Sequence, residues 1–600
     1  MTLEDLRPRA EEILKQYEKP RAAMLPLLWL VQESEGHVSP EAELWVAGVL
    51  GMARSHVHEV VTFYNMVHTA PVGRRELRVC TSLPCQLRGA GALLERIREE
   101  LGIAPGETTA DGALTLTEVE CLCACELSPM LQLDEAFAGP VENGLLDRVL
   151  TAGRTDPAGA DPLPEPEPTI TTDGPVLSTR LGDPEGTWFD AYVADGGYEA
   201  ARKALTELAP QDVIEEVSRA NLRGLGGAGF PAGRKWSFVP KGTEKPKYLV
   251  VNADEGEPGT FKDRYILERD PHALLEGMLL AAYAIGSHKA YVYIRGEYFR
   301  SARRLQRAID EAVEHNWLGR DVQGTGFDLD VVIHRGAGAY ICGEETALLT
   351  SLEGGKGFPR LKPPFPAISG LFACPTIVNN VETLTCVPYI LRHGAEKFAA
   401  IGTETQGGTR LFCVSGHVAR PGVYEAPVGV TLRELIEGPA GGIRDGNRLK
   451  AVIPGGISAK VLTADEIDVG MDFDSLLTAG SMAGSGGVIV MDHTTCMVEA
   501  LESASRFFAD ESCGQCSPCR EGTGWIHRIL TRVLEGRGQG QDLDDLLAIA
   551  GDMEGKTICV FADAAAWPVQ SYIAKFREEF EEFVRSGRSA ADRRAAACSS

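Results

Sequence analysis

Residues 248–259 read YLVVNADEGEPG, an apolar strand pattern that runs directly into an acidic loop. Two further strand candidates follow at residues 290–294 and 329–333, and the second leads into the glycine-containing loop 336–345. Strands that alternate with helical patterns predict a parallel α/β sheet, in which ligands bind at the carboxyl ends of the strands. We therefore expect a ligand site at these two loops. A solvated acidic loop or a Mg²⁺ site is the alternative for the carboxylates.

A glycine-rich loop lies ahead of this strand. Residues 224–229 read GLGGAG, which matches the dinucleotide-binding pattern G-x-G-x-x-G. That pattern requires a strand immediately before the loop, whereas the apolar residues of segment 212–218 follow helical spacing. A standard Rossmann loop is therefore not indicated. The glycines predict either a tight turn or a close approach of the backbone to an anionic or planar ligand, for which Arg234 and Lys235 supply positive charge.

The composition excludes several classes of protein. The chain has 600 residues, 44% of them apolar and 24% charged, which is typical of a folded protein, and its length suggests about four domains. A net charge of −26 argues against a nucleic-acid surface. No apolar run approaches the roughly 20 residues of a membrane span, and the start lacks a secretory signal, so we expect a cytoplasmic protein. In a reducing compartment its 15 cysteines favour metal ligands over disulfides.

Four cysteines among the first 150 residues form a candidate metal site. Their spacing is Cys80-x4-Cys85, then 35 intervening residues, then Cys121-x3-Cys125. Thiolates from two separate loops can enclose a binuclear 2Fe-2S centre, whose two irons need four soft anionic ligands. A zinc site or a set of buried free thiols is the alternative. Cys123 lies between two candidate ligands, and its role stays open.

A second group of cysteines lies near the end of the chain. It reads Cys513-x2-Cys516-x2-Cys519, with Cys559 farther along. Two consecutive x2 gaps let three thiolates surround one face of a cubane, and a remote fourth ligand completes a 4Fe-4S site. A zinc ribbon or a redox C-x-x-C pair is the alternative.

These motifs together resemble a known pair of proteins. The central and C-terminal motifs are similar to the NADH-binding flavoprotein subunit of respiratory complex I over roughly residues 180–585. They are LRGLGGAGFP (222–231), NADE (252–255), GAGAYICGEETAL (336–348), NNVET (379–383) and SCGQCSPCR (512–520). The first 150 residues, with VECLCAC at 119–125, resemble the thioredoxin-like 2Fe-2S subunit that accompanies it. The chain therefore resembles a fusion of the two subunits.

The resemblance implies an α/β multidomain architecture. The implied parts are an N-terminal helical head (1–72), a thioredoxin-like 2Fe-2S domain (73–150), a Pro-rich linker (151–180), a Rossmann-like FMN/NADH-binding α/β domain (181–405), a β-grasp domain (406–490), a helical bundle with the 4Fe-4S site (491–587) and a disordered tail (588–600). The linker also follows from the sequence itself, because five prolines between residues 157 and 168 favour an extended spacer.

The resemblance also implies ligand contacts. FMN would be contacted by Gly224, Gly226, Lys235, Asn252, Asp254, Gly343, Asn379, Asn380 and Thr383. NAD(H) would be contacted by Phe230, Lys235, Phe238, Glu257, Tyr340, Glu344, Glu345 and Phe365. Glu257 near the adenosine ribose would repel the extra phosphate of NADPH, which predicts a preference for NAD. The chain departs from the family pattern at Leu225, usually arginine, and at Cys123, usually glycine.

The implied activity is reversible hydride transfer between NAD(H) and FMN, followed by one-electron transfer to the two iron–sulfur clusters. No catalytic side chain is expected, because the cofactors carry this chemistry. An intact 2Fe-2S head fused to the flavoprotein is most similar to the β subunit of NAD-dependent formate dehydrogenases, whose partner is an iron–sulfur-rich molybdenum or tungsten subunit. A fused NADH-input subunit of complex I, peripheral to the inner face of the membrane, or of an NAD-linked hydrogenase is the alternative. A non-catalytic zinc-binding scaffold is the alternative from another class.

Overall fold

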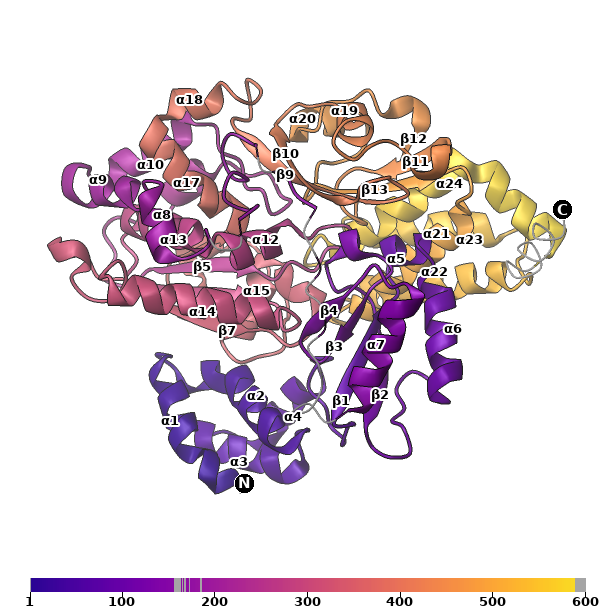
Figure 1. Cartoon of the computed structure of the whole chain (residues 1–600), viewed down its shortest axis with the longest axis horizontal. Helices are drawn as coiled ribbons and strands as arrows, with labels where there is room; N and C mark the ends of the chain where they lie inside the picture. The colour runs from indigo at the N-terminus through magenta and orange to yellow at the C-terminus, as the bar shows by residue number, and fades with distance from the viewer. Residues whose placement is uncertain are drawn as a thin grey trace.

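The computed structural model describes residues 2–588 except 156–162, 164–165, 167–168, 172 and 184–185. A helical head, a small sheet domain, a central sheet domain, a mixed-sheet domain and a C-terminal bundle follow one another along the chain. Figure 1 shows the head below the central sheet domain and the small sheet domain below the bundle. Apart from Arg588, the predicted disordered tail lies outside the described residues, as does much of the predicted linker.

The head and the small sheet domain form the first 154 residues. The head has helices α1 (Arg7–Lys15), α2 (Met24–Glu35), α3 (Pro40–Leu50) and α4 (Arg54–Val61). The small sheet domain has β1 (Arg75–Cys80), α5 (Leu83–Leu87), α6 (Ala90–Leu101), β2 (Leu114–Val119), β3 (Leu131–Leu133), β4 (Ala136–Ala138) and α7 (Asn143–Arg154). Its strand order is β2-β1-β3-β4. Because β1 and β2 pair in parallel with Cys80 opposite Val119, Cys80 and Cys121 meet at one edge of the sheet.

The central sheet domain has four parallel strands in the order β7-β6-β5-β8. Its elements are α8 (Phe189–Ala194), α9 (Glu199–Glu207), α10 (Pro210–Arg219), α11 (Ala232–Ser237), β5 (Tyr248–Ala253), α12 (Lys262–Arg269), α13 (Pro271–Ile285), β6 (Lys289–Ile294), α14 (Phe299–Glu314), β7 (Asp330–Arg335), α15 (Glu345–Leu352), α16 (Pro366–Ser369), β8 (Thr376–Asn380), α17 (Val381–His393) and α18 (Ala395–Ala399). The sequence patterns predict β5, β6 and β7, and the structure adds β8 on the other side of β5. Helix α10, rather than a strand, precedes the glycine loop, in agreement with the helical spacing.

Both faces of this sheet are buried, as a parallel sheet requires. Leu249 and Val251 of β5 belong to a core that includes α13 and α17. Tyr248 and Val250, on the opposite face, belong to a core shared with the head. Within that core the ring of Tyr17 stacks on Tyr291 of β6, with ring centroids 5.8 Å apart. The head therefore covers part of one face of the central sheet, together with α15.

The last two parts are a mixed sheet and a helical bundle. The mixed-sheet domain has β9 (Thr409–Gly416), β10 (Gly422–Pro427), α19 (Leu432–Glu437), β11 (Leu449–Ile453), β12 (Leu462–Thr463), α20 (Phe473–Thr478) and β13 (Gly487–Asp492), with strand order β10-β9-β13-β11-β12. The bundle has α21 (Met497–Glu511), α22 (Ser517–Leu534), α23 (Asp542–Met553) and α24 (Phe561–Ser586).

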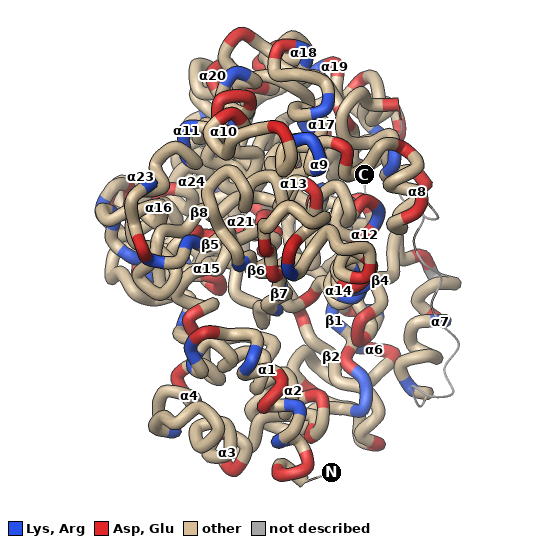
Figure 2. Tube along the Cα trace, turned by 90° about the vertical axis from the view of Figure 1, so that its left-hand side faces the viewer, with Lys and Arg blue, Asp and Glu red and all other residues tan. Residues whose placement is uncertain are grey.

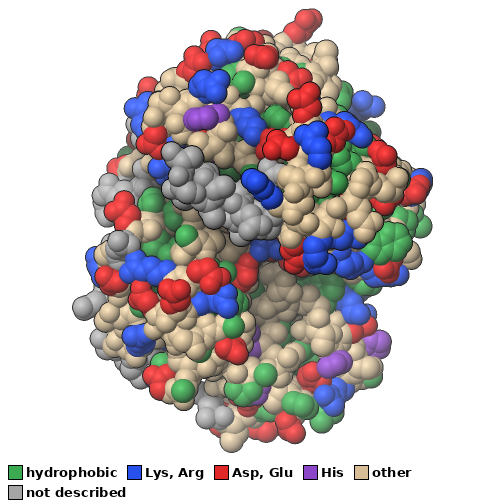
Figure 3. Space-filling model, turned by 90° about the vertical axis from the view of Figure 1, so that its right-hand side faces the viewer, with side chains coloured by type: hydrophobic (Ala, Val, Ile, Leu, Met, Phe, Trp, Pro, Cys, Tyr) green, Lys and Arg blue, Asp and Glu red, His purple; other side chains and the backbone are tan. Residues whose placement is uncertain are grey.

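The net negative charge is spread over the molecule. Asp and Glu lie on elements throughout the fold, interspersed with Lys and Arg (Figure 2). On the face drawn in Figure 3, acidic and basic side chains are also intermixed. None of the helices in the described part of the chain combines the length and the apolar composition that a membrane-spanning segment needs.

Candidate functional site

The central sheet places two predicted ligand segments side by side. The chain proceeds from β5 outward to β7 and then crosses back to β8, so the topological switch point lies between β5 and β8. Open α/β sheets bind ligands in the crevice beyond the carboxyl ends of the strands at such a point. Asn252 pairs with Asn380 across the two strands. The predicted residues that follow β5 and those that end β8 therefore lie at one edge.

The glycine loop packs against the N-terminus of α17 at this edge. The Leu225 N–H donates to Thr383 Oγ1 over 2.9 Å. A Cβ at Gly226 would lie 2.9 Å from Cβ of Asn380, so only glycine allows this approach. Asn380 is the N-cap of α17, and its side chain accepts from the Thr383 N–H. A glycine loop beside the N-terminus of a 13-residue helix is a favourable place for a phosphate group.

A buried ion network orients Asn380. Its Nδ2 donates to Asp263 Oδ2 over 2.6 Å, which turns its amide oxygen toward the helix N-terminus. Lys262 Nζ lies 2.7 Å from the Asp263 carboxylate and 2.8 Å from Glu382. Burial opposes the charge on Lys262, but the two carboxylates outweigh it and raise its pKa. Sequence patterns missed Lys262 and Asp263, because neither belongs to a ligand motif, whereas Glu382 lies within the NNVET motif without a predicted role.

The loop that leads from β7 to α15 carries the next group of predicted residues. Glu344 caps α15 by accepting from the N–H groups of Thr346 and Ala347. Lys235 Nζ lies 3.1 Å from Glu345, and Lys362 Nζ lies 3.1 Å from the same carboxylate. Burial opposes ionisation of Glu345, but the charges of Lys235 and Lys362 outweigh it and lower its pKa. Lys362 is a site residue that sequence reasoning missed.

Glu257 and Tyr340 form a second contact between the loops. The Tyr340 hydroxyl donates to Glu257 Oε2 over 2.5 Å, and the Ser458 N–H of the mixed-sheet domain donates to Glu257 Oε1 over 2.8 Å. The Tyr340 N–H donates to Glu511 of the bundle over 2.9 Å. Burial raises the pKa of Glu257, although both of its hydrogen bonds favour the carboxylate. The predicted nucleotide residues are thus held by three different parts of the chain.

Three predicted aromatic residues lie at the surface of the site. The side chains of Phe230, Phe238 and Phe365 are 42%, 45% and 57% exposed. The ring centroids of Phe230 and Phe238 are 6.0 Å apart, and the guanidinium of Arg234 lies over both rings. Exposed aromatic faces of this kind are available to stack on a planar ligand. The structure brings Phe230 and Phe238 together and records no ring contact between them and Phe365 among the described residues.

One buried carboxylate oxygen at this edge has no hydrogen-bond partner in the protein, and it indicates whether FMN fits the site. Asp254 follows β5, and its Oδ2 is buried without a hydrogen-bond partner. Burial raises its pKa well above the usual range. Nearby, Asn252 Nδ2 donates to the Gly343 carbonyl, which joins the two ligand loops. A buried polar atom needs a partner, and the hydrogen-bonding edge of a bound flavin supplies one.

The four C-terminal cysteines line one hollow. It is enclosed by Cys513, Cys516, Cys519, Cys559, Gln515, Thr557, Phe561, Pro359 and Ile341. Three of the thiols come from the segment around the start of α22, and Cys559 comes from the turn before α24. Ile341 belongs to the turn that follows Tyr340, so the hollow adjoins the nucleotide loop. This arrangement fits the ligand set of a 4Fe-4S cluster.

The four N-terminal cysteines are buried together at the edge of the small sheet. Cys80, Cys85, Cys121 and Cys125 are each at most 6% exposed. Hydrogen bonds from the thiols of Cys123, Cys125 and Cys80 lower the pKa of Cys121 well below its usual range. Cys123 has a left-handed φ of 49°, and its Sγ lies 3.6 Å from the Cys121 Sγ. Four clustered soft ligands fit a 2Fe-2S centre.

A single bound metal ion fits these groups less well. Within the part of the chain that the structure describes, no three His, Cys, Asp or Glu side chains are arranged to hold one ion. Zinc needs four ligands that converge at roughly 2.0–2.3 Å, whereas the ligands of a cluster surround several iron and sulfide atoms. The described residues therefore give no support to a single zinc ion at the cysteines or to Mg²⁺ at the acidic loop.

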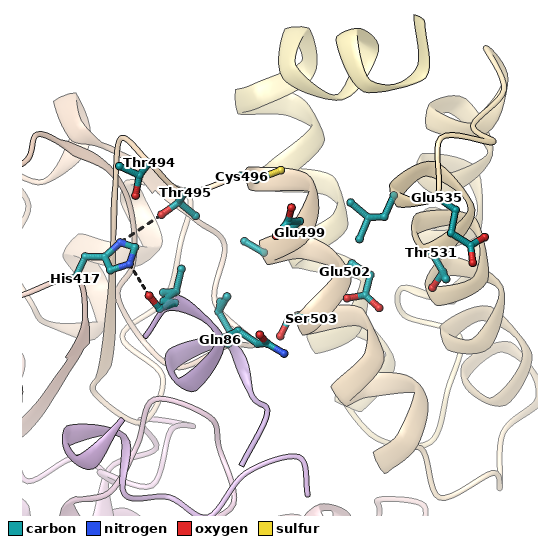
Figure 4. Close-up of a pocket in the computed structure, with 14 residues that line it drawn as sticks. Gln86, His417, Thr494, Thr495, Cys496, Glu499, Glu502, Ser503, Thr531 and Glu535 are labelled. Carbon is teal, nitrogen blue, oxygen red and sulfur yellow. Dashed lines mark hydrogen bonds between the residues drawn. The ribbon is translucent and has the colours of Figure 1, made fainter. Parts of the chain in front are cut away.

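A separate cavity lies away from the predicted site. It has a volume of about 580 Å³ and opens between α5, the loop before α21, and helices α21 and α22 (Figure 4). Its lining includes His417, Glu499, Glu502 and Ser503. None of the predicted site residues, all of which the structure describes, lines this cavity. This cavity is therefore separate from the site that the ligand motifs indicate.

Four family models match the chain. They are the thioredoxin-like [2Fe-2S] ferredoxin (residues 10–154), the Nuo51 FMN-binding domain (217–389), the SLBB domain (410–490) and the NADH-ubiquinone oxidoreductase-F iron-sulfur binding region (499–583). The first of them spans most of the head as well as the small sheet domain. The matched domains assign the chain FMN, one 2Fe-2S cluster and one 4Fe-4S cluster.

Individual proteins are similar over larger parts of the chain. The second F-type subunit of the NADH-quinone oxidoreductase of Rhizobium meliloti is 54% identical over 414 residues, which are 69% of this chain and 98% of that protein. The F-type subunit of Rickettsia felis is 55% identical over 65% of this chain and 92% of that protein. A chain of the air-oxidized NAD⁺-reducing [NiFe]-hydrogenase superposes with a TM-score of 0.81 at 31% identity, over 93% of both chains. This chain is an NAD-linked flavin and iron–sulfur oxidoreductase, and it belongs to the family of the F-type subunits of NADH-quinone oxidoreductase.

Proposed function

We propose that the chain is the NADH-handling β subunit of an NAD-dependent formate dehydrogenase, with a molybdenum or tungsten iron–sulfur subunit as its partner. One observation carries the proposal: two sets of four clustered cysteines lie on the same chain as the candidate nucleotide site. The motif resemblance supports a fused subunit with an intact 2Fe-2S head. A chain that receives or donates electrons through two clusters needs a partner that carries the other half-reaction.

FMN would be held by the residues at the switch point. When bound, FMN supplies the conversion between hydride transfer with NAD(H) and one-electron transfer to iron–sulfur clusters. Gly224 and Gly226 would let the loop backbone approach the ligand, and Asn380 and Thr383 at the N-terminus of α17 would hold its phosphate. Asp254 would pair with the polar edge of the ring system. Gly343, Asn379, Asn252 and Lys235 are assigned to the same ligand.

NAD(H) would enter beside the exposed aromatic residues. Phe230, Phe238 and Phe365 would stack on the planar parts of the dinucleotide and exclude water from the reacting face. Glu257 and Tyr340 would hold the adenosine ribose. Glu344 and Glu345, fixed by Lys362, would place acceptors beside the nicotinamide end.

A hydrogenase subunit is the second candidate. The observation that favours it is the whole-chain similarity to the NAD⁺-reducing [NiFe]-hydrogenase, which covers 93% of both chains. Formate dehydrogenase is favoured by the motif resemblance of a flavoprotein fused to a head domain that keeps all four cysteines. The two candidates differ in the metal of the partner and in the reductant that drives NAD⁺ reduction.

Purification of the native complex separates the candidates. We expect the complex, isolated anaerobically, to contain molybdenum or tungsten and to reduce NAD⁺ with formate. Metal analysis and NADH absorbance measure both properties. Nickel together with hydrogen-driven NAD⁺ reduction would replace the proposal by the hydrogenase assignment, and NADH oxidation linked only to quinone would replace it by complex I.

Glu257→Gln tests the nucleotide preference. Removal of the negative charge is expected to raise kcat/KM for NADPH about tenfold or more, equivalent to ~1.4 kcal/mol, because repulsion of the extra phosphate is relieved. Since burial raises the pKa of Glu257, wild-type discrimination against NADPH should also weaken as pH falls and the carboxylate takes up a proton. Steady-state kinetics with both nucleotides across pH measure these effects.

Glu244→Gln is the control, because Glu244 is an exposed glutamate before β5. Unchanged NADPH kinetics in Glu257→Gln would contradict the placement of Glu257 beside the adenosine ribose.

Cys559→Ala tests the cluster hollow. Loss of the fourth ligand is expected to abolish the 4Fe-4S cluster and to lower the iron content from about six to about two atoms per chain, with FMN retained. Iron analysis and electron paramagnetic resonance measure the result. Cys496→Ala is the matched control, because Cys496 precedes α21 outside the hollow. A complete 4Fe-4S signal in Cys559→Ala would remove Cys559 from the ligand set.

A further inference from the structure

The helical head donates to three consecutive carbonyls of the nucleotide loop. Trp29 Nε1 of α2 donates to the Gly336 carbonyl over 3.1 Å. The backbone N–H groups of Met66 and Asn65 donate to the carbonyls of Ala337 and Gly338 over 3.0 and 3.2 Å. These carbonyls directly follow β7, whose pairing with β6 ends at Arg335. The path of the chain from β7 to Tyr340 is therefore set by the head.

Close packing reinforces these hydrogen bonds. Met66 is 5% exposed, and a Cβ at Gly338 would lie 2.8 Å from its Cγ. Gly338 has a left-handed φ of +77°. A Cβ at Gly296, in the turn after β6, would lie 2.7 Å from the Met66 sulfur. Glycine is favoured at position 338 by its left-handed φ, and at position 296 because a Cβ would also lie 2.8 Å from the Gly336 carbonyl oxygen.

The head also contacts the helix that follows the loop. The Tyr64 hydroxyl contacts Ser351 Oγ at 2.6 Å and donates to the Gly355 carbonyl over 3.0 Å. Ser351 belongs to α15, the helix that Glu344 caps. Tyr64 is 2% exposed, so these bonds are shielded from water. The segment from Tyr64 to Met66 therefore contacts both the strand end and the helix between which Tyr340 and Gly343 lie.

This head segment is itself fixed to α2. Gln32 Nε2 donates to the Met66 carbonyl over 2.7 Å, and Gln32 Oε1 accepts from the His68 N–H over 2.7 Å. On the other side of the loop, the guanidinium of Arg335 lies 4.3 Å from the Trp29 ring and 4.6 Å from the ring of Phe299. Helix α2 and the segment Tyr64–Met66 are therefore bonded to each other as well as to the loop.

We propose that Trp29 and the segment Tyr64–Met66 are positioning residues for the NAD(H) site. By holding the loop 336–339 in one conformation, the head places Tyr340, Glu344 and Glu345 for the nucleotide before it binds. A preorganised loop loses less conformational freedom on binding, and therefore binds more tightly, than one that must order. This inference rests on the proposed function for the identity of the nucleotide site. It assigns the head a role in nucleotide affinity in addition to its role in covering the sheet.

Trp29→Phe removes the donor and keeps an aromatic ring. In the full chain, loaded with FMN and clusters, we expect the Kd for NAD⁺ to rise about three- to tenfold, the range that the loss of one partly buried hydrogen bond produces. KM for NADH should rise while kcat with an artificial acceptor is retained, and backbone amides of the segment 336–345 should exchange hydrogen faster. Calorimetry, steady-state kinetics and hydrogen-exchange mass spectrometry measure these quantities.

Trp45→Phe is the matched control. Trp45 lies in the same head, is also half-buried, and donates its Nε1–H to Glu4 instead of to the loop, so this variant should match the wild type. Tyr64→Phe is a second variant, which removes the hydrogen bonds to Ser351 and Gly355. It should also raise the Kd for NAD⁺ and speed amide exchange in the loop, and it replaces Trp29→Phe as the test if Trp29→Phe does not fold.

Wild-type affinity and wild-type exchange in both Trp29→Phe and Tyr64→Phe would overturn the inference. A wild-type chain that does not bind NAD⁺ would reject the proposed nucleotide site, and the exchange rates would still decide whether the head holds the loop.

Discussion

The central sheet is entirely parallel, and burial of both its faces is the constraint on which the rest of the structure depends. One face is covered by α13 and α17 of the same domain, and the other is covered in part by the head, through contacts such as Tyr17 on Tyr291. The head therefore completes the core of a domain that begins more than 100 residues later in the sequence. It is held there by the same apolar burial that stabilises the sheet, and this placement brings Trp29 and Met66 to the nucleotide loop.

The candidate site lies where several parts of the chain converge on one edge of that sheet. The glycine loop and the N-terminus of α17 supply backbone N–H groups, while the mixed-sheet domain and the bundle hold Glu257 and Tyr340 through Ser458 and Glu511. Several charged side chains at this edge of the sheet are buried in ion pairs or networks. Lys262, for example, lies between the carboxylates of Asp263 and Glu382. Such networks are costly to leave half-satisfied, so they favour one arrangement of the loops. The hollow of the C-terminal cysteines begins at the same loop, through Ile341.

Local patterns predict the parts of this site that depend on spacing. Three of the four central strands follow from apolar runs, and the two cysteine groups follow from their intervals, including the remote Cys559. The family resemblance supplies the FMN and NAD(H) contacts, which stay predictions. The patterns do not predict β8, because TIVNN is short and half polar, nor Lys362, Ser458 and Glu511, because each reaches the site only through tertiary contacts. The sequence also does not predict the contact of Trp29 with the loop. Trp29 lies in an apolar helix, where its neighbours indicate core packing, and its hydrogen bond to Gly336 joins residues 307 positions apart.

The most direct test of the account is an anaerobic titration of the purified, fully loaded chain with NADH, followed by visible absorption. The account places the nucleotide, the flavin and both clusters within one chain, so it predicts that stoichiometric NADH bleaches the flavin band and the broad iron–sulfur absorption together. A chain that contains FMN, iron and sulfide in full amounts and whose spectrum does not respond to NADH would contradict it.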